Sequence, residues 1–184
     1  MSPESATYVV LLDMKAATQR DFAIWESRTG WGEQYPIWTL DELRKEFPEL
    51  EIVLIDIADP GVLNSIVEEP GLKFGFNLGI SRRLPDTVLE VFSGGVINVH
   101  PGLLPRYRGS SAVEWAILEK EFVGCSVHLM VAELDGGPLT LREKYVFPSS
   151  FRYRDVRQFV YERQVFLLTN FAECAQRGMG LMQV

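Results

Sequence analysis

The sequence predicts an α/β protein with a Rossmann-like, mostly parallel sheet that is flanked by helices and carries a late antiparallel strand pair. Apolar, β-branched runs alternate with segments of helical spacing, which is typical of parallel sheets with crossover helices. An Asp-Gly-Gly-Pro turn then separates two apolar runs, which predicts paired strands. A length of 184 residues is that of one domain, so we expect a single domain over residues 1–184.

The elements of the first half follow from short apolar runs and the turn residues that end them. Thr39 and Glu42 have capping-box spacing, and Asp59-Pro60-Gly61 ends one strand and opens a helix. In chain order we expect a strand at 8–12, a helix at 16–28, a helix from residue 39, a strand at 51–57 and a helix at 60–69.

The second half is predicted by the same signals. Gly94-Gly95 ends a helix, and the final segment has apolar residues at helical spacing. We expect a strand at 72–76, a helix at 85–92, a strand at 96–99, a loop at 101–109, a helix at 112–120, strands at 125–131 and 139–147, and a helix at 154–176.

The composition excludes several classes of protein. The formal net charge of −7 disfavours nucleic-acid binding, which depends on Lys and Arg to neutralise phosphates. We expect no nucleic-acid partner and no membrane contact, because no apolar run reaches the length of a membrane span. No secretory signal is visible, which predicts a cytoplasmic location. Two cysteines and two histidines without ligand spacing predict no metal site.

The most informative residues are Asn98, His100 and Asp135, each close to a turn-forming Gly or Pro. An amide, an imidazole and a carboxylate can stabilise an oxyanion and move a proton during acyl transfer to an amine. Ligands of parallel α/β sheets bind beyond the carboxyl ends of strands, where Asn98 and His100 are expected. Each residue alone has a plain alternative, since a histidine often completes a loop and Asp before Gly-Gly is a common turn former.

Two longer stretches carry a family resemblance. Residues 97–109 (INVHPGLLPRYRG) and 124–138 (GCSVHLMVAELDGGP) resemble the signature of the 10-formyltetrahydrofolate-dependent formyltransferases. The resemblance is strong from about residue 79 to 147, whereas residues 1–70 share only the general order of strands and helices. It implies the formyltransferase fold, 10-formyltetrahydrofolate as co-substrate, no metal, and a small primary amine as acceptor.

The resemblance also implies roles for individual residues. Asn98, His100 and Asp135 match the family's catalytic triad, and His128 stands where some members carry a supporting histidine. Two segments match the walls of the family's folate pocket. They contain Ser81, Arg82, Arg83 and Leu84 in the first, and Val131, Ala132, Glu133 and Leu134 in the second.

The implied reaction is attack of an unprotonated amine on the formyl carbon. Asn98 and a protonated His100 would donate hydrogen bonds to the oxyanion, and Asp135 would keep His100 charged or help to move the proton of the amine. Such a carboxylate–imidazole pair is expected to titrate together. The bland alternative for His128 is a strand histidine that only supports the triad loop.

Three departures from the family leave the acceptor open. Residues 12–18 lack the glycine-rich turn with which the glycinamide ribonucleotide branch holds a phosphate. Gln164 stands where that branch has a glutamate for the amine, with Glu162 nearby, and Gly102 replaces a serine that is common in the family. Arg106 and Arg108 are candidates for a substrate phosphate or carboxylate, or form a solvated loop.

Three hypotheses therefore stand beside one another. The leading one is an N-formyltransferase acting on an amino sugar, an amino-acid-derived amine or glycinamide ribonucleotide. The others are a formyltetrahydrofolate hydrolase (deformylase), in which water replaces the amine, and a non-catalytic folate-binding member. The chain is expected to be a minimal stand-alone enzyme or a catalytic fragment, and its sequence does not indicate an oligomeric state.

Overall fold

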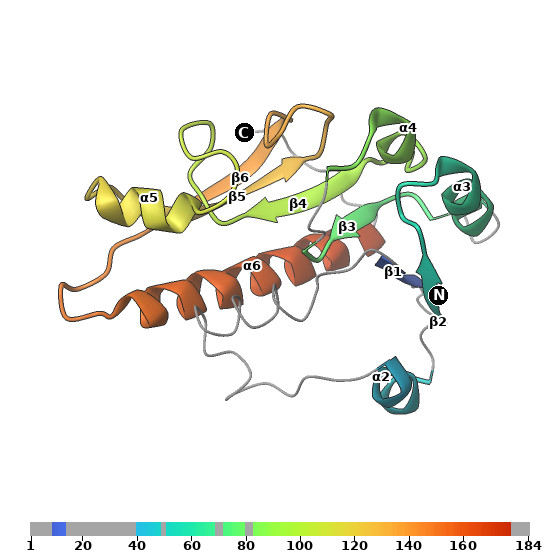
Figure 1. Ribbon diagram of the computed structural model, residues 1–184, viewed down its shortest axis with the longest axis horizontal. Coiled ribbons are helices and arrows are strands. Elements are labelled where there is room, and N and C mark those ends of the chain that lie inside the picture. The colour runs from blue at the N-terminus through green and yellow to red at the C-terminus, as the bar shows by residue number, and fades with distance from the viewer. Residues whose placement is uncertain (1–8, 14–39, 49–50, 69–71, 80–82, 178–184) are drawn as a thin grey trace.

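The strands form two groups in the computed structural model, which describes residues 9–13, 40–48, 51–68, 72–79 and 83–177 (Figure 1). The first group is a parallel pair, and the second is a four-stranded sheet in the order β3-β4-β5-β6. The strands are β1 (Val9–Asp13), β2 (Glu51–Ile55), β3 (Gly75–Asn77), β4 (Val96–His100), β5 (Val123–Leu129) and β6 (Leu139–Tyr145).

The sheet of four strands is mixed. β3 and β4 are parallel, whereas β4 with β5 and β5 with β6 are antiparallel. The α/β class and the late antiparallel pair β5–β6 are confirmed, and the described parallel pairs are β1–β2 and β3–β4. The sheet becomes antiparallel one strand earlier than expected because β5 returns alongside β4.

Helices cover the sheet, and they begin and end close to their expected positions. α6 runs along one side of the four strands and contacts β4 and β5, while α5 contacts β5 (Figure 1). The described helices are α2 (Leu40–Glu46), α3 (Pro60–Glu68), α4 (Asp86–Leu89), α5 (Ala112–Leu118) and α6 (Tyr153–Gln176). The helix expected at 16–28 lies outside the described residues.

β3 and α4 differ most in length from what the sequence pattern predicts. Strand pairing of β3 begins only at Gly75, because the preceding backbone bonds the Gly94 turn instead, through Gly94 N and the carbonyl of Lys73 at 2.7 Å. α4 ends at Leu89 because the next backbone N–H groups, of Val91 and Phe92, bond carbonyls three residues earlier. That tighter turn closes the helix before Gly95.

The core consists of two apolar clusters on which the site rests. One joins β4 and β5 to α5 and α6, and the other joins β2 and α3 to α4 and the start of β4. Fully buried members include Ile97, Val113, Val127 and Val160 in the first cluster and Leu63 and Val88 in the second. β4 therefore contacts both clusters, which fixes the strand that carries Asn98 and His100.

Gly124 allows the loop after β4 to pack against β5. A Cβ atom at this position would lie 2.2 Å from the carbonyl oxygen of Glu143 and 2.5 Å from Leu103 Cδ2. We expect Gly124→Ala to lower the free energy of unfolding by roughly 1–3 kcal/mol, because an added methyl group overpacks this contact. Urea denaturation measures the change.

Gly61→Ala is the matched control, since its Cβ would approach only Asp59 Oδ1, at 3.3 Å, at an exposed position of α3. Equal stability of Gly124→Ala and wild type would contradict the packing argument.

Candidate active site

Three polar residues on neighbouring strands form a row across the sheet. Asn77 on β3 stands opposite Asn98 on β4, and Asn98 stands opposite His128 on β5. Side chains of residues that are paired across strands lie within contact distance. Strand register, not sequence proximity, therefore brings these three residues together.

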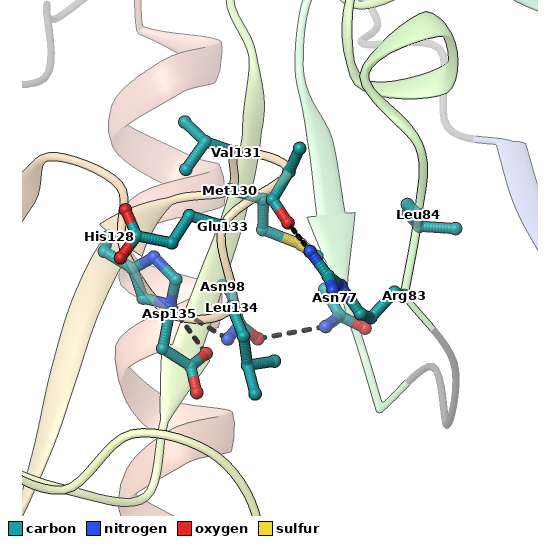
Figure 2. A pocket seen from close by; sticks show the side chains of 11 residues that line it. Asn77, Arg83, Leu84, Asn98, His128, Met130, Val131, Glu133, Leu134 and Asp135 are labelled. Carbon is teal, nitrogen blue, oxygen red and sulfur yellow. Dashed lines mark hydrogen bonds and ion pairs between the residues drawn. The ribbon is translucent and has the colours of Figure 1, made fainter.

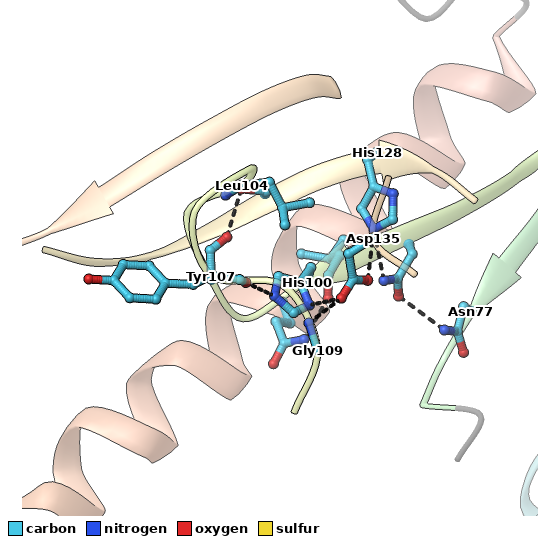
Figure 3. A network of polar contacts seen from close by, with 12 residues as sticks. Asn77, His100, Leu104, Tyr107, Gly109, His128 and Asp135 are labelled. Carbon is cyan, nitrogen blue, oxygen red and sulfur yellow. Dashed lines mark hydrogen bonds and ion pairs between the residues drawn. The ribbon is translucent and has the colours of Figure 1, made fainter. Parts of the chain in front are cut away.

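Hydrogen bonds connect the row along its whole length (Figure 3). Asn77 Nδ2 donates to Asn98 Oδ1 at 3.0 Å, and Asn98 Nδ2 lies 3.1 Å from His128 Nε2. His128 Nδ1 lies 2.9 Å from the carbonyl oxygen of Leu129. A carbonyl oxygen only accepts, so His128 carries its hydrogen on Nδ1 and accepts from Asn98 at Nε2.

The carboxylate of Asp135 lies between the two imidazoles. Its Oδ2 is 3.4 Å from His100 Nδ1, and its Oδ1 is 3.6 Å from His128 Nε2. Its side chain is only 10% exposed, and Oδ2 accepts the backbone N–H of Gly109 at 2.7 Å. The predicted trio of Asn98, His100 and Asp135 is thus assembled through His128 (Figure 3).

The backbone at Asp135 adopts an uncommon conformation, with φ at 48°. Aspartate tolerates this left-handed region better than most residues. Gly137, two residues later, lies so close to β5 that an added Cβ would be 1.8 Å from the carbonyl oxygen of Leu129. The Asp-Gly-Gly-Pro turn therefore aims a carboxylate at the histidines while its own backbone packs on β5.

The pKa of Asp135 results from opposing effects. Burial raises it, but the N–H of Gly109 and the imidazoles of His128 and His100, which stabilise the carboxylate when they carry a second proton, together lower the pKa of this carboxyl to about 2. Asp135 is therefore a carboxylate throughout the neutral range.

His100 differs from the sequence expectation in its protonation. Burial lowers the pKa of His100 below its ordinary value, and the charge of Asp135 and the carbonyl of Tyr107 offset this only in part. This direction of the pKa argues against a resting imidazolium, and the two expected roles of Asp135, keeping His100 charged or helping to move the proton of the amine, stay predictions. His100 Nε2 lies 2.6 Å from the carbonyl oxygen of Tyr107, so that nitrogen carries the hydrogen and Nδ1 faces Asp135.

Gly102 makes room for this orientation of His100. A Cβ at residue 102 would lie 2.8 Å from His100 Nε2 and 2.7 Å from the carbonyl oxygen of Tyr107. The serine expected in other family members would not fit without moving one of these groups. The replacement therefore changes the space around His100, and its effect extends beyond loop flexibility.

A pocket of about 230 Å³ lies beside the polar row (Figure 2). Asn98, His128 and Asp135 line one side, and Arg83 and Leu84 line the other. His100 is not among the lining residues, because it lies behind Asp135. The remaining lining residues are Asn77, Met130, Val131, Ala132, Glu133 and Leu134.

The pocket unites most of the residues that the sequence assigned to folate. Arg83 and Leu84 from the first segment face Val131, Ala132, Glu133 and Leu134 from the second across the pocket. Ser81 and Arg82 lie outside the described residues. Asn77 and Met130 were not anticipated.

Polar contacts hold the loop 131–135 from both sides. The guanidinium of Arg83 donates to the carbonyl oxygen of Ala132, and Asp86 Oδ1 accepts the N–H of Ala132 at 3.1 Å. On the other side, Arg108 forms an ion pair with Glu133. The pocket wall is therefore anchored to α4 and to the loop after β4.

The four residues predicted to bind substrate are not brought together. Arg106 pairs with Glu119 and Glu121 at 2.9 and 3.0 Å and is 58% exposed. Arg108 lies at the pocket rim through its pair with Glu133, a residue of the lining.

The two candidates on α6 contact other groups of the chain. Glu162 accepts from Gln158 of its own helix at 3.0 Å. Gln164 donates to the carbonyl oxygen of Val99 at 2.6 Å and so supports β4 between Asn98 and His100. Their roles toward a substrate stay predictions.

Asn77 is the polar site residue that sequence reasoning missed. It ends a short strand parallel to β4, so its side chain meets Asn98 at the same edge of the sheet. The signal was an asparagine at the carboxyl end of a strand next to the one that carries the triad. The strand was predicted at residues 72–76, one residue short of Asn77, so Asn77 was not recognised as a strand residue.

The described residues form neither a cluster of metal ligands nor a membrane-spanning helix. Within the described ranges, no group of three or more His, Cys, Asp or Glu side chains is arranged to hold a metal ion. None of the described helices is long and apolar enough to cross a membrane.

Sequence comparison shows relatives over the segment that carries the site. Residues 78–150 match the family model described as formyl transferase. A methionyl-tRNA formyltransferase of Borrelia hermsii (strain HS1 / DAH) is 37% identical over 58% of this chain and 36% of that protein. One from Borrelia garinii subsp. bavariensis is 33% identical over 69% of this chain and 41% of that protein. The chain thus spans less than half the length of these relatives.

Solved structures share the fold at low sequence identity. A glycinamide ribonucleotide transformylase from Symbiobacterium toebii superposes with a TM-score of 0.66 at 17% identity, covering 95% of this chain and 90% of that one. A phosphoribosylglycinamide formyltransferase from Coxiella burnetii gives 0.68 at 21%, covering 95% and 89%. The formyltransferase PseJ from Anoxybacillus kamchatkensis gives 0.59 at 14%, covering 96% and 80%.

The depressed pKa of Asp135 predicts a pH-dependent contribution to stability. Its pKa falls from 3.8 to about 2 on folding, so the carboxylate stabilises the fold above about pH 4 and loses this effect as the pH falls toward 2. We expect Asp135→Asn to lower the free energy of unfolding by about 2 kcal/mol near neutral pH. Chemical denaturation at a series of pH values measures the difference.

The difference between wild type and variant is expected to shrink as the pH falls from about 4 to 2. Asp41→Asn, on exposed helix α2, is the control for loss of one charge. A difference between wild type and Asp135→Asn that stayed constant across this range would contradict the assignment.

Proposed function

Because this chain belongs to the formyl transferase family, we propose that it is an N-formyltransferase that moves the formyl group of 10-formyltetrahydrofolate to a primary amine. The observation that carries the proposal is the convergence of Asn98, His128 and Asp135 on one pocket wall, with His100 behind Asp135. An amide donor, a carboxylate and two imidazoles suit acyl transfer to nitrogen.

The folate occupies the pocket beside loop 131–135 in this proposal. Six of the eight residues assigned to it from the sequence line that pocket, and they combine apolar walls with main-chain groups. A flat, largely apolar ring with polar edges matches such a lining. The formyl group then points toward Asn98, at the inner end.

The amine attacks the formyl carbon and the carbonyl oxygen becomes negative. Asn98 Nδ2 donates one hydrogen to His128, and its second hydrogen is directed to the developing oxyanion. The tetrahedral intermediate collapses when the bond from carbon to the folate nitrogen breaks. The amine loses one proton and the leaving nitrogen gains one.

His100 and Asp135 carry this proton. His100 is neutral near pH 7 because burial lowers its pKa, and its Nδ1 faces the Asp135 carboxylate at 3.4 Å. A proton that reaches the pair is stabilised by the carboxylate charge. This assignment differs from the sequence expectation in giving the oxyanion to Asn98 and the proton to His100, whose two nitrogens are both directed at other groups.

The acceptor amine is open among several classes. Relatives are named for methionyl-tRNA and one structural neighbour for glycinamide ribonucleotide, and another neighbour is in complex with the UDP-linked formamido sugar UDP-4,6-dideoxy-4-formamido-L-AltNAc. The net charge of −7 argues against tRNA, and the two basic candidates for a phosphate, Arg106 and Arg108, are already paired with carboxylates. We therefore favour a small amine, and methionyl-tRNA belongs in the test.

The test is incubation of the chain with 10-formyltetrahydrofolate and a panel of amines. The panel contains an amino-sugar nucleotide, amino-acid-derived amines, glycinamide ribonucleotide and methionyl-tRNA. Formylated amine supports the proposal. Formate release without an amine product indicates a deformylase, and binding without turnover indicates a non-catalytic member, and either result refutes it.

Asn98→Ala tests the oxyanion role directly. We expect kcat with the best acceptor to fall by roughly 10²–10³, because one preorganised donor is lost. Equilibrium binding of tetrahydrofolate is expected to change little, since the walls of the pocket remain. Asn64→Ala, exposed on α3, is the matched control and keeps wild-type kcat. An Asn98→Ala enzyme with more than about a tenth of the wild-type rate is incompatible with this role.

A further inference from the structure

The polar row across the sheet has a single direction. Gly79 N–H donates to Asn77 Oδ1 at 3.0 Å, Asn77 Nδ2 donates to Asn98 Oδ1, and Asn98 Nδ2 donates to His128 Nε2. His128 Nδ1 then donates to the carbonyl oxygen of Leu129. Every member therefore accepts from one neighbour and donates to the next. The dashed lines that join Asn77 and His128 to the asparagine between them mark the central bonds in Figure 3.

Backbone groups at the two ends set this direction. A backbone N–H only donates and a backbone carbonyl only accepts, whereas an asparagine amide can turn over and a histidine can change tautomer. Gly79 fixes the oxygen of Asn77 toward itself, and Leu129 fixes the hydrogen of His128 on Nδ1. The three side chains between them have one arrangement that satisfies all four bonds.

The residue at position 79 contributes through its backbone conformation. Gly79 has φ at +115°, a region that side chains rarely adopt, while a Cβ there would meet nothing within 4 Å. The glycine is thus explained by conformation and not by crowding. This conformation directs the N–H of residue 79 back toward the side chain of Asn77, as in an Asx turn.

The direction matters because Asn98 lines the pocket. The shape of an asparagine is nearly unchanged when its oxygen and nitrogen are exchanged, so packing alone does not distinguish an NH₂ from an oxygen at the pocket wall. An NH₂ can stabilise an oxyanion, whereas a carbonyl oxygen would repel it. The function of Asn98 therefore depends on which way its amide is turned.

We propose that Asn77 is a positioning residue that turns the Asn98 amide so that its NH₂ faces His128 and the pocket. This inference rests on the proposed function for its catalytic consequence, while the orientation itself is a property of the protein alone. Asn77 acts through Asn98 and is not assigned a contact with the reacting atoms.

Asn77→Asp replaces the NH₂ group that donates to Asn98 Oδ1 by a carboxylate oxygen, and the size and shape of the side chain hardly change. A carboxylate only accepts, so it retains the bond from Gly79 N–H but repels Asn98 Oδ1, and the Asn98 amide turns its NH₂ toward residue 77. We expect kcat to fall about 10²-fold, as for loss of an oxyanion donor. Asn64→Asp adds the same charge at an exposed position of α3 and is the matched control.

The pH dependence separates orientation from general damage. In Asn77→Asp, protonation of the introduced carboxylate would restore a donor, because its O–H can again donate to Asn98 Oδ1. The ratio of variant to wild-type kcat is therefore expected to rise as the pH falls. A ratio that stays constant with pH, or falls with it, would overturn the proposal. A general structural defect of the variant would give such a ratio, because protonation of residue 77 would not repair it.

NMR of the full chain tests the orientation without any substrate. In the wild type, the side-chain amide protons of Asn98 are expected to show NOEs to the His128 ring, and the ring nitrogens to show the Nδ1–H tautomer. In Asn77→Asp, the NOEs to His128 are expected to disappear. Their absence in the wild type, or their persistence in the variant, would overturn the proposal.

The formylation assay and the NOE measurement test the proposed function and the orientation of Asn98 separately. Wild-type protein with the expected NOEs but no formylation of any amine would refute the proposed function and leave the orientation of Asn98 intact. An active wild type whose Asn77→Asp variant keeps full kcat and unchanged NOEs would refute the inference and leave the proposed function intact.

Discussion

The structure of the site depends on one buried carboxylate. Asp135 lies between two imidazoles and accepts the N–H of Gly109, so it connects β4, β5, the loop after β4 and its own turn. A carboxylate so enclosed is stable only when its lone pairs are satisfied. The N–H of Gly109 donates to one carboxylate oxygen, and both imidazoles lie beside the carboxylate, so the pocket wall and the site are joined at this residue.

Strand register supplies the second constraint. β5 runs antiparallel to β4, so His128 stands opposite Asn98 and Ser126 stands opposite His100. Ser126, which is fully buried, donates to the carbonyl oxygen of Gly102 and accepts the N–H of Leu104. The loop after β4 is thereby fixed to β5 at its start. A shift of one residue would turn these side chains to the other face of the sheet.

Burial and nearby charges give the polar side chains of the site different protonation states and positions. The side chains are those of Asn98, His100, His128 and Asp135. The N–H of Gly109 and the neighbouring imidazoles lower the pKa of Asp135, whereas the pKa of His100 is lowered because burial outweighs the nearby carboxylate. Asn98 and His128 line the pocket, and His100 stands behind them as a partner of Asp135. Asn98 and Asp135 therefore face the pocket, and His100 lies behind Asp135.

The sequence by itself determined the α/β class, the late strand pair and the residues Asn98, His100 and Asp135. Apolar periodicity records which segments are buried, and the glycines and prolines beside the trio record tight turns. Six of the eight residues that the family resemblance assigns to folate line one pocket, because residues adjacent in sequence remain adjacent in a loop.

Only the tertiary structure decided the partners and the protonation of these residues. Asn77, 21 residues before Asn98, became part of the site through parallel pairing, which no local pattern encodes. Gln164, for which a role at the substrate stays a prediction, supports β4 because the helix that carries it packs on that strand. The charge of His100 follows from its burial, a property of the packed molecule that depends on every segment around the ring.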